Sequence, residues 1–352
     1  MVLMTTYVLG AGASLHAGYP LLADLPYALK AWAERTRLPE ASHIAWLCTR
    51  IASDPADRGS TNFEQLLTDL EAAGPQKVTL PDGDWFYPLL LVEGLPLLIS
   101  NFFDGLRGKS DASAYRKFAT CVIEPGDAVI TFNYDVALEK ELAAVGKWHI
   151  GTGYGFPIFL EKSTVCVLKL HGSTNWKSVT DGTLGPSTFN VDDPHGSRPM
   201  ILDHDLQWLG FGGLKDPLLT QGRPVLGGAP QHTFLLPKTY KEFPGRMWSY
   251  LWEQAKSVLK GSSRVAIAGY SLPEADEKAR NLILGECSRS ARIVLRCKAK
   301  THALAGEFKA AGFSNVDADD KQDFEAWVNE AAGRSGAKAA GESISASNAT
   351  CS

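Results

Sequence analysis

Short runs of hydrophobic residues recur along the chain, and longer segments with a helical spacing of apolar positions lie between them. Most of the runs are continuous rather than alternating, which is typical of strands buried on both faces of a parallel sheet. This alternation of strand and helix predicts an α/β fold with a Rossmann-like, doubly wound parallel sheet. The expected strands are TTYVLGAG (5–12), GDAVITFNYD (126–135), VCVLKLHGS (165–173), HTFLLPK (232–238), SRVAIAGYSL (263–272) and ARIVLRC (291–297), and the expected helices are DVALEKELAAV (135–145), RMWSYLWEQAKSVL (246–259) and EADEKARNLILGEC (274–287).

Two long insertions interrupt this alternation. The first, 31–120, is expected to be largely helical, because its apolar residues recur on one helix face. The second, 175–231, is rich in glycine and proline and is expected to form an irregular lobe over the functional site. The final residues are poor in hydrophobic side chains, which predicts disorder. The expected organisation is one domain over 1–332, with a Rossmann-like core at about 5–30 and 120–320, followed by a disordered tail at 333–352.

Composition and charge exclude several classes of protein. Of 352 residues, 45% are hydrophobic and 21% charged, and the formal net charge is −4, so no basic excess indicates a nucleic-acid surface. The six cysteines form no Cys-x-x-Cys pair, which fits neither a zinc ribbon nor a disulfide framework. We therefore expect a cytoplasmic protein that does not bind nucleic acid directly.

The N-terminal segment and the longest apolar run are not expected to engage a membrane. The first residues, MVLMTTYVLGAG, lack the basic region and the cleavage site of a signal peptide. The run at 87–103 contains Glu93, Gly94 and Pro96, and it is expected to be too short and too interrupted to cross a bilayer.

A glycine-rich turn follows the first expected strand. In VLGAGAS (8–14), Gly10 and Gly12 would let the backbone approach a diphosphate, and free N–H groups at the next helix would bind it. The third glycine of the usual dinucleotide motif is replaced by Leu15, and no strand ending in an acidic residue follows about 20 residues later. Alone, the motif fits a tight strand–helix turn equally well.

Three further strands also end in small or polar residues. One ends at Thr131-Phe132-Asn133-Tyr134-Asp135, the next at Leu170-His171-Gly172-Ser173, and a later one at Gly269-Tyr270-Ser271. A lone histidine such as His171 is more often structural than catalytic, and Ser271 could instead cap a helix. Ligands of an open parallel sheet bind where the carboxyl ends of its strands converge, so four such ends together indicate a binding site.

The order of these motifs resembles the sirtuin (silent-information-regulator) family, which has a Gly-Ala-Gly-x-Ser loop, a Gln-Asn-Ile-Asp motif, a His-Gly motif and a late Gly-Thr-Ser loop. Thr-Phe-Asn-Tyr-Asp, Leu-His-Gly-Ser and Gly-Tyr-Ser-Leu-Pro-x-x-Asp look closer to the bacterial sirtuin-like branch used in antiphage defence. The segments NFEQLL (62–67) and LLPKTYKEF (235–243) also look like features of that branch.

Two departures separate the chain from deacylating sirtuins. The zinc-binding cysteines that should follow His171 are absent, and Phe132 stands where those enzymes carry glutamine. The branch resembled here hydrolyses NAD+, using the asparagine and the histidine. The resemblance therefore implies an NAD+ glycohydrolase that depletes NAD+ during phage infection. It also implies a homo-oligomer and a regulatory partner, such as a ring-forming ATPase or a phage sensor.

The residue types suit that reaction. Asn133 would hold a water molecule or a ribose hydroxyl, and His171 would take a proton from it near neutral pH. Asp135 would bind the nicotinamide amide or orient its neighbours. The turn residues Gly10, Ala11, Gly12 and Ser14 would cradle the diphosphate, and Ser271 with its loop would meet the adenosine ribose. The other expected binding residues are Thr131, Phe132, Gly172, Ser173, Gly269 and Tyr270.

Two other functions remain open, and a metal site is not expected. The alternatives are an NAD-dependent protein deacylase and a sensor that binds NAD+ or ADP-ribose without cleaving it. The second insertion contains several acidic and histidine residues, but their spacing matches no helix-borne metal motif, and solvated acidic loops are common. Those residues are Asp192, Asp193, His195, Asp203, His204 and Asp205.

Overall fold

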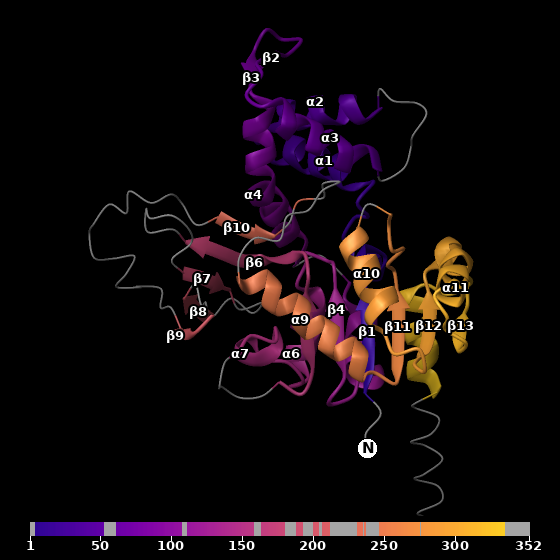
Figure 1. Ribbon diagram of the computed structural model, residues 1–352. Coiled ribbons are helices and arrows are strands. Elements are labelled where there is room, and N and C mark those ends of the chain that lie inside the picture. The colour runs from indigo at the N-terminus through magenta and orange to yellow at the C-terminus, as the bar shows by residue number, and fades with distance from the viewer. Residues whose placement is uncertain are drawn as a thin grey trace, which may run out of the picture.

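A six-stranded parallel sheet forms the centre of the computed structural model (Figure 1). All its pairings are parallel, and its strand order is β13-β12-β11-β1-β4-β5. The strands are β1 (Thr5–Leu9), β4 (Ala128–Thr131), β5 (Cys166–Lys169), β11 (Arg264–Ala268), β12 (Arg292–Arg296) and β13 (Val316–Ala318). The structure describes residues 4–52, 61–107, 111–157, 163–179, 188–192, 200–203, 206–211, 231–234, 236, 246–274 and 276–334.

The strand order is that of a doubly wound sheet and confirms the predicted fold class. From the central β1 the chain proceeds through β4 to β5 at one edge, and it then crosses to β11 and continues to β13 at the other edge. The direction of winding changes between β1 and β11, and such switch points open a crevice at the carboxyl ends of the strands. The fold therefore places the ends of β1, β4, β5 and β11 around one crevice.

Helices cover both faces of the sheet. The clearest is α9, where Trp248, Leu251, Trp252, Ala255 and Leu259 are buried at helical spacing and the helix packs on β5. The helical elements around the sheet, α9 included, are η1 (Ala11–Ala17), α6 (Ala137–Ala144), α7 (Ile150–Gly153), α9 (Arg246–Gly261), α10 (Glu277–Glu286), η3 (Lys298–Lys300), α11 (Thr301–Ala310) and a last helix at 324–334.

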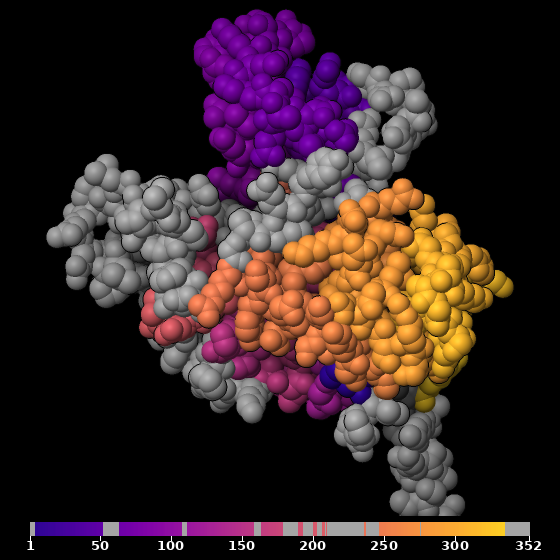
Figure 2. All heavy atoms as spheres, viewed as in Figure 1, coloured from indigo at the N-terminus to yellow at the C-terminus, as the bar shows by residue number. Residues whose placement is uncertain are grey.

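The first insertion forms a helical lobe that stands above the carboxyl ends of the sheet (Figures 1 and 2). Its helices pack on one another, α1 on α2 and α3 on α4. The elements of this lobe are α1 (Leu25–Thr36), α2 (Ala41–Ala52), α3 (Thr61–Ala73), β2 (Val78–Thr79), β3 (Trp85–Phe86) and α4 (Pro88–Arg107). The last two elements of the insertion, α5 (Ser113–Lys117) and η2 (Phe118–Val122), instead pack beside the sheet, where Phe118 contacts Tyr7 of β1.

The longest apolar run differs from expectation in one respect. It forms a single 20-residue helix, α4, that continues through Pro96. Among the described residues, α4 is the one helix long and apolar enough to cross a membrane by length and composition. One face of α4 is buried against α3, β6 and β10, while Leu90 and Leu97 are exposed on another. This packing is that of a core helix.

The second insertion contains regular structure that its composition did not indicate. Its described residues form an antiparallel sheet in the order β10-β6-β7-β8-β9, and the expected strand HTFLLPK belongs to this sheet rather than to the parallel one. None of the described residues of 175–231 lines the cavity at the carboxyl ends of the parallel strands. The strands are β6 (Gly172–Val179), β7 (Thr188–Val191), β8 (Met200–Asp203), β9 (Trp208–Phe211) and β10 (Gln231–Phe234).

Candidate functional site

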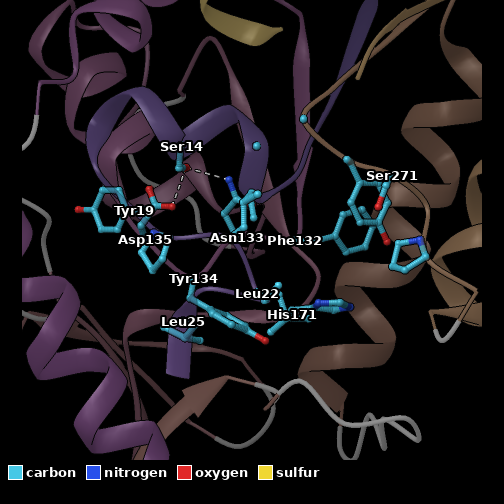
Figure 3. Close-up of a pocket in the computed structure, with 18 of the residues that line it drawn as sticks. Ser14, Tyr19, Leu22, Leu25, Phe132, Asn133, Tyr134, Asp135, His171 and Ser271 are labelled. Carbon is cyan, nitrogen blue, oxygen red and sulfur yellow. Dashed lines mark hydrogen bonds between the residues drawn. The ribbon is translucent and has the colours of Figure 1, made fainter. Parts of the chain in front are cut away.

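A cavity of about 290 Å³ lies at the carboxyl ends of β1, β4, β5 and β11, beneath the helical lobe (Figure 3). Its volume is close to the lower end of the range for small-molecule sites. Apolar and aromatic side chains make up much of the wall, with a few polar groups among them. The lining residues are Ala11, Gly12, Ser14, Tyr19, Pro20, Leu21, Leu22, Ala23, Leu25, Glu64, Phe103, Phe132, Asn133, Tyr134, Asp135, His171, Gly269, Tyr270, Ser271, Pro273 and Asp276.

The glycine-rich turn packs directly against the loop after β11. Gly12 N donates to Gly269 O at 2.9 Å. A Cβ on Gly10 would lie 2.6 Å from Gly269 O, and a Cβ on Gly269 would lie 2.2 Å from Ala13 N. Gly269 also has a φ of +63°, a conformation that favours glycine. These glycines are therefore required for backbone-to-backbone contact between two loops that line the cavity.

Asn133 is held in one orientation by two acceptors. Its Nδ2 donates to Gly10 O and to Ser14 Oγ, each at 2.9 Å. Because a carbonyl oxygen can only accept, the contact with Gly10 fixes which end of the amide carries nitrogen. The opposite atom, Oδ1, is buried and has no hydrogen-bond partner among the residues that the structure describes. A buried orphan acceptor on a cavity wall is a place for a ligand or water hydrogen.

Ser14 is fully engaged with its neighbours. Its Oγ donates to Asp135 Oδ2 at 2.8 Å, so Tyr115 Oη, 2.7 Å away, donates to Ser14. Burial raises the pKa of Tyr115 well above its usual value, which keeps that phenol protonated. Ser14 therefore has one donor bond and two acceptor bonds within the protein, and it positions Asn133.

Asp135 orients the segment that follows β4. Its Oδ2 accepts from Ser14, and its Oδ1 accepts from Ala137 N at 3.1 Å, at the start of α6. Lys169 Nζ donates to the backbone oxygen of Asp135 and lies 2.9 Å from Glu139 Oε1. Both charged side chains are at most 1% exposed. The buried Lys169–Glu139 ion pair thus holds the backbone of Asp135, whose residue lines the cavity.

His171 lies between aromatic rings and a carboxylate. Phe132 meets the imidazole edge-on, with ring centroids 4.9 Å apart, and stacks on Tyr270 at 4.2 Å and 14°. His171 Nε2 is 3.0 Å from Asp276 Oδ2, although the two are not aligned as a hydrogen bond. The same oxygen accepts from Tyr270 Oη at 3.0 Å. Burial and then Asp276 raise the pKa of Tyr270, so its phenol remains a donor.

The structure brings most of the predicted site residues to one cavity. Four of them do not line the cavity themselves but lie next to residues that do. Thr131 Oγ1 accepts from Asn133 N at 3.1 Å, Gly10 O accepts from Asn133, and Ser173 Oγ donates to Tyr134 O at 3.3 Å. Gly172 takes a φ of +84° in the turn after His171. Those on the wall are Ala11, Gly12, Ser14, Phe132, Asn133, Asp135, His171, Gly269, Tyr270 and Ser271.

Ser271 does not begin a helix, contrary to one of its two sequence interpretations. Helix α10 begins at Glu277, and Asp276 occupies the N-cap position. Ser271 instead lies exposed at the cavity, in the loop after β11. The interpretation that places it at a ligand site remains.

Sequence reasoning missed the residues that enclose the cavity. Tyr19 to Leu25 form one wall, Phe103 of α4 another, and Glu64 of α3 adds a carboxylate that is 3% exposed. Asp276 was also missed as a site residue. Glu64 lies in the segment NFEQLL and Asp276 in GYSLPEAD, but neither segment shows from its sequence that this acidic side chain faces the cavity.

The described residues contain no group of three or more His, Cys, Asp or Glu side chains that could hold a metal ion. Of the weighed metal ligands, Asp192 pairs with Lys177 at 2.7 Å, whereas Asp193, His195, His204 and Asp205 lie outside the described residues. Burial raises the pKa of Cys166 to about 12, which keeps this thiol neutral and unreactive.

No protein-family model matches the chain, and no curated protein matches it. Several solved structures are similar at low identity. One is a Sir2 homolog–NAD complex, with a TM-score of 0.42 and 13% identity over 94% of this chain and 89% of that one. Another is Sir2 bound to acetylated peptide, with a TM-score of 0.41 and 11% identity over 95% and 93%. Similarity at this level carries no weight for the reaction, which has to be inferred from the chain's own residues.

Proposed function

We propose that the cavity binds NAD+ and hydrolyses the bond between its ribose and nicotinamide. The observation that carries this proposal is the orphan Oδ1 of Asn133, buried on the wall of a cavity that His171 also lines. An acceptor of fixed orientation and a basic group in one enclosed site suit the addition of water to a sugar carbon.

The residues divide the task as follows. Asn133 Oδ1 accepts a hydrogen bond from the attacking water or from a ribose hydroxyl, and its amide cannot rotate, because Nδ2 is held by two bonds. His171 takes the proton released by that hydroxyl or water. Nicotinamide leaves as a neutral molecule from a cationic ring, so it needs little help from an acid.

The acidic residues suit the charge of the reaction. Asp135 and Asp276 line the cavity beside Asn133 and His171 and are each at most 5% exposed. The breaking bond leaves positive charge on the ribose, and fixed negative groups in an enclosed site favour such a charge. The pocket therefore suits a substrate that passes through a cationic sugar.

We further propose, from the sequence resemblance, that this activity depletes NAD+ as the effector of an antiphage, abortive-infection system. A homo-oligomer and a regulatory partner, such as a ring-forming ATPase or a phage sensor, belong to the same proposal. Assembly of the purified protein, alone and with candidate partners encoded beside it, would test this part by mass measurement in solution.

The main test is release of nicotinamide from NAD+ by the purified protein. Asn133→Ala and His171→Ala are each expected to lower the rate by at least about 100-fold. The matched controls Asn281→Ala and His302→Ala change exposed residues of the same types and should leave it unchanged. Wild-type protein that neither binds nor cleaves NAD+ would refute the proposal.

A second arm separates hydrolysis from deacylation and from sensing. Wild-type protein is given NAD+ together with an acetyl-lysine peptide. Free ADP-ribose formed at the same rate with and without peptide supports the hydrolase. Acetyl-ADP-ribose that appears only with peptide would establish the deacylase instead. Tight binding of NAD+ with no product, in the presence of every candidate partner, would establish a sensor.

A further inference from the structure

Asp276 occupies a helix N-cap without capping the helix. An aspartate at this position usually accepts from the backbone N–H of the first turn. Here the side chain makes no cap hydrogen bond to α10, and its carboxylate points instead toward Tyr270 and His171. The residue is 4% exposed and lines the cavity. The carboxylate of Asp276 therefore does not cap α10 and lies next to His171, the candidate base.

The position of Asp276 is set by its backbone. Its N–H donates to Pro273 O at 3.0 Å, and its carbonyl accepts from Arg280 N at 3.0 Å. Arg280 is itself anchored, because it donates to Leu272 O at 2.7 Å and pairs with Glu307. The carboxylate therefore projects from a segment that is fixed at both ends.

The position of the His171 imidazole is also fixed by its neighbours. Phe132 lies against His171 and is stacked on Tyr270, so one ring holds both partners of the carboxylate in place. His171 Nε2 lies 3.0 Å from Oδ2. Two lone pairs at that distance would repel each other, so Nε2 carries a proton whenever Asp276 is ionised. In the neutral imidazole, the lone pair then resides on Nδ1.

We propose that Asp276 is the positioning residue of His171: it holds the proton on Nε2 and makes Nδ1 the atom that accepts the proton in the reaction. The catalytic part rests on the proposed NAD+ hydrolysis, whereas the assignment of the tautomer does not. Tyr270 Oη donates a hydrogen bond to the same oxygen and fixes the direction of the carboxylate.

The tautomer can be measured without any activity. Two-dimensional ¹H–¹⁵N spectra of ¹⁵N-histidine-labelled protein distinguish protonated from unprotonated ring nitrogens, and His171→Gln identifies the signal. Wild-type protein is expected to show Nε2 protonated and Nδ1 unprotonated. In Asp276→Ala the carboxylate is removed, so the proton is no longer held on Nε2, and protein with the proton on Nδ1 is expected to appear. A wild-type His171 with its proton on Nδ1 would overturn the proposal.

Kinetics then test whether the tautomer matters. Asp276→Ala is expected to lower kcat for NAD+ by about 10- to 100-fold, with KM changed less than about threefold. Tyr270→Phe removes only the second donor, and its loss should be smaller. Asp276→Ala with a changed tautomer but a wild-type kcat would overturn the positioning role. If wild type cleaves no NAD+ under any condition, the proposed function fails, while the spectra still decide the His171–Asp276 pairing.

Discussion

The two sides of the cavity are built in different ways. The side formed by the sheet carries polar groups that are bonded to one another, such as Ser14, Asn133 and Asp135. The side formed by the helical lobe carries Leu25 of α1 and Phe103 of α4 together with one carboxylate, Glu64. The difference separates two tasks: strand ends fix the reacting groups, and the insertion encloses them. Changes on the sheet side should therefore cost stability as well as activity, whereas changes on the insertion side should affect binding.

The buried Lys169–Glu139 pair gives the largest expected effect. Lys169→Met leaves Glu139 buried without its cation and is expected to lower the free energy of unfolding by about 3–5 kcal/mol at pH 8. Urea denaturation measures the loss. The matched control is the double variant Lys169→Met/Glu139→Gln, which should recover much of it. A single variant as stable as wild type would contradict the supporting role of the pair.

The same variant has a defined pH dependence. Burial raises the pKa of Glu139 even though Lys169 opposes this, and removing Lys169 raises it further. A carboxyl whose pKa is higher in the folded state binds a proton on folding, so its contribution favours the folded state at low pH and is lost as pH rises. The deficit of Lys169→Met should therefore be smaller at pH 5 than at pH 8.

The contact between the two loops gives the next largest effect. Gly269→Ala places a Cβ 2.2 Å from Ala13 N at a φ of +63°, and it is expected to cost about 2–3 kcal/mol. Gly285→Ala makes the same change within α10, where no atom of the described residues lies within 4 Å of the new Cβ, and should stabilise by about 0.5–1 kcal/mol. Thermal unfolding compares the two. Equal effects would show that the loops are not in tight contact.

Glu64→Gln tests the insertion side. Because the carboxylate lines the cavity, its replacement by a neutral amide is expected to raise KM for NAD+ about tenfold, with kcat within about threefold of wild type. Steady-state nicotinamide release gives both constants. Glu71→Gln changes an exposed carboxylate on the same helix and should alter neither. A loss confined to kcat would instead place Glu64 in the chemical step.

The smallest effect is expected on the exposed face of α4. Leu97 is 54% exposed, so Leu97→Ser should change the free energy of unfolding by no more than about 0.5 kcal/mol. Leu95→Ala, at a position with no exposure, should cost about 2–5 kcal/mol. Urea denaturation of both variants tests whether α4 is a core helix. A large loss from Leu97→Ser would mean that this face is covered in solution.

Local pattern predicted the parallel sheet and the polar strand ends, because each buried strand is a continuous apolar run that stops at a distinct motif. Asn133 and His171 could be placed together because parallel strands end at the same edge of a sheet. The short strands β7, β8 and β9 gave no such signal, since each has four residues within glycine- and proline-rich sequence. Strand β13 is shorter still, at three residues.

The remaining site residues depend on contacts between distant segments. Glu64 appears in the sequence as one polar position of an amphipathic helix, and only the packing of the insertion over the sheet turns it toward the cavity. Asp276 precedes a helix, and its commitment to Tyr270 and His171 appears only once their loops are placed side by side. Glycines 10 and 269 are required because two backbones meet, which neither motif reveals alone.

The central position of β1 also determines when the site can exist during synthesis. On one side β1 pairs with β4, which begins at Ala128, but its other neighbour begins at Arg264, roughly 140 residues later. At about 5–20 residues per second, a ribosome needs roughly 7–30 s to make that stretch. A nascent chain that already carries Asn133 and His171 still lacks Gly269, Tyr270 and Asp276. If the protein consumes NAD+, that activity therefore cannot arise before the segment 269–276 has been synthesised and packed against β1.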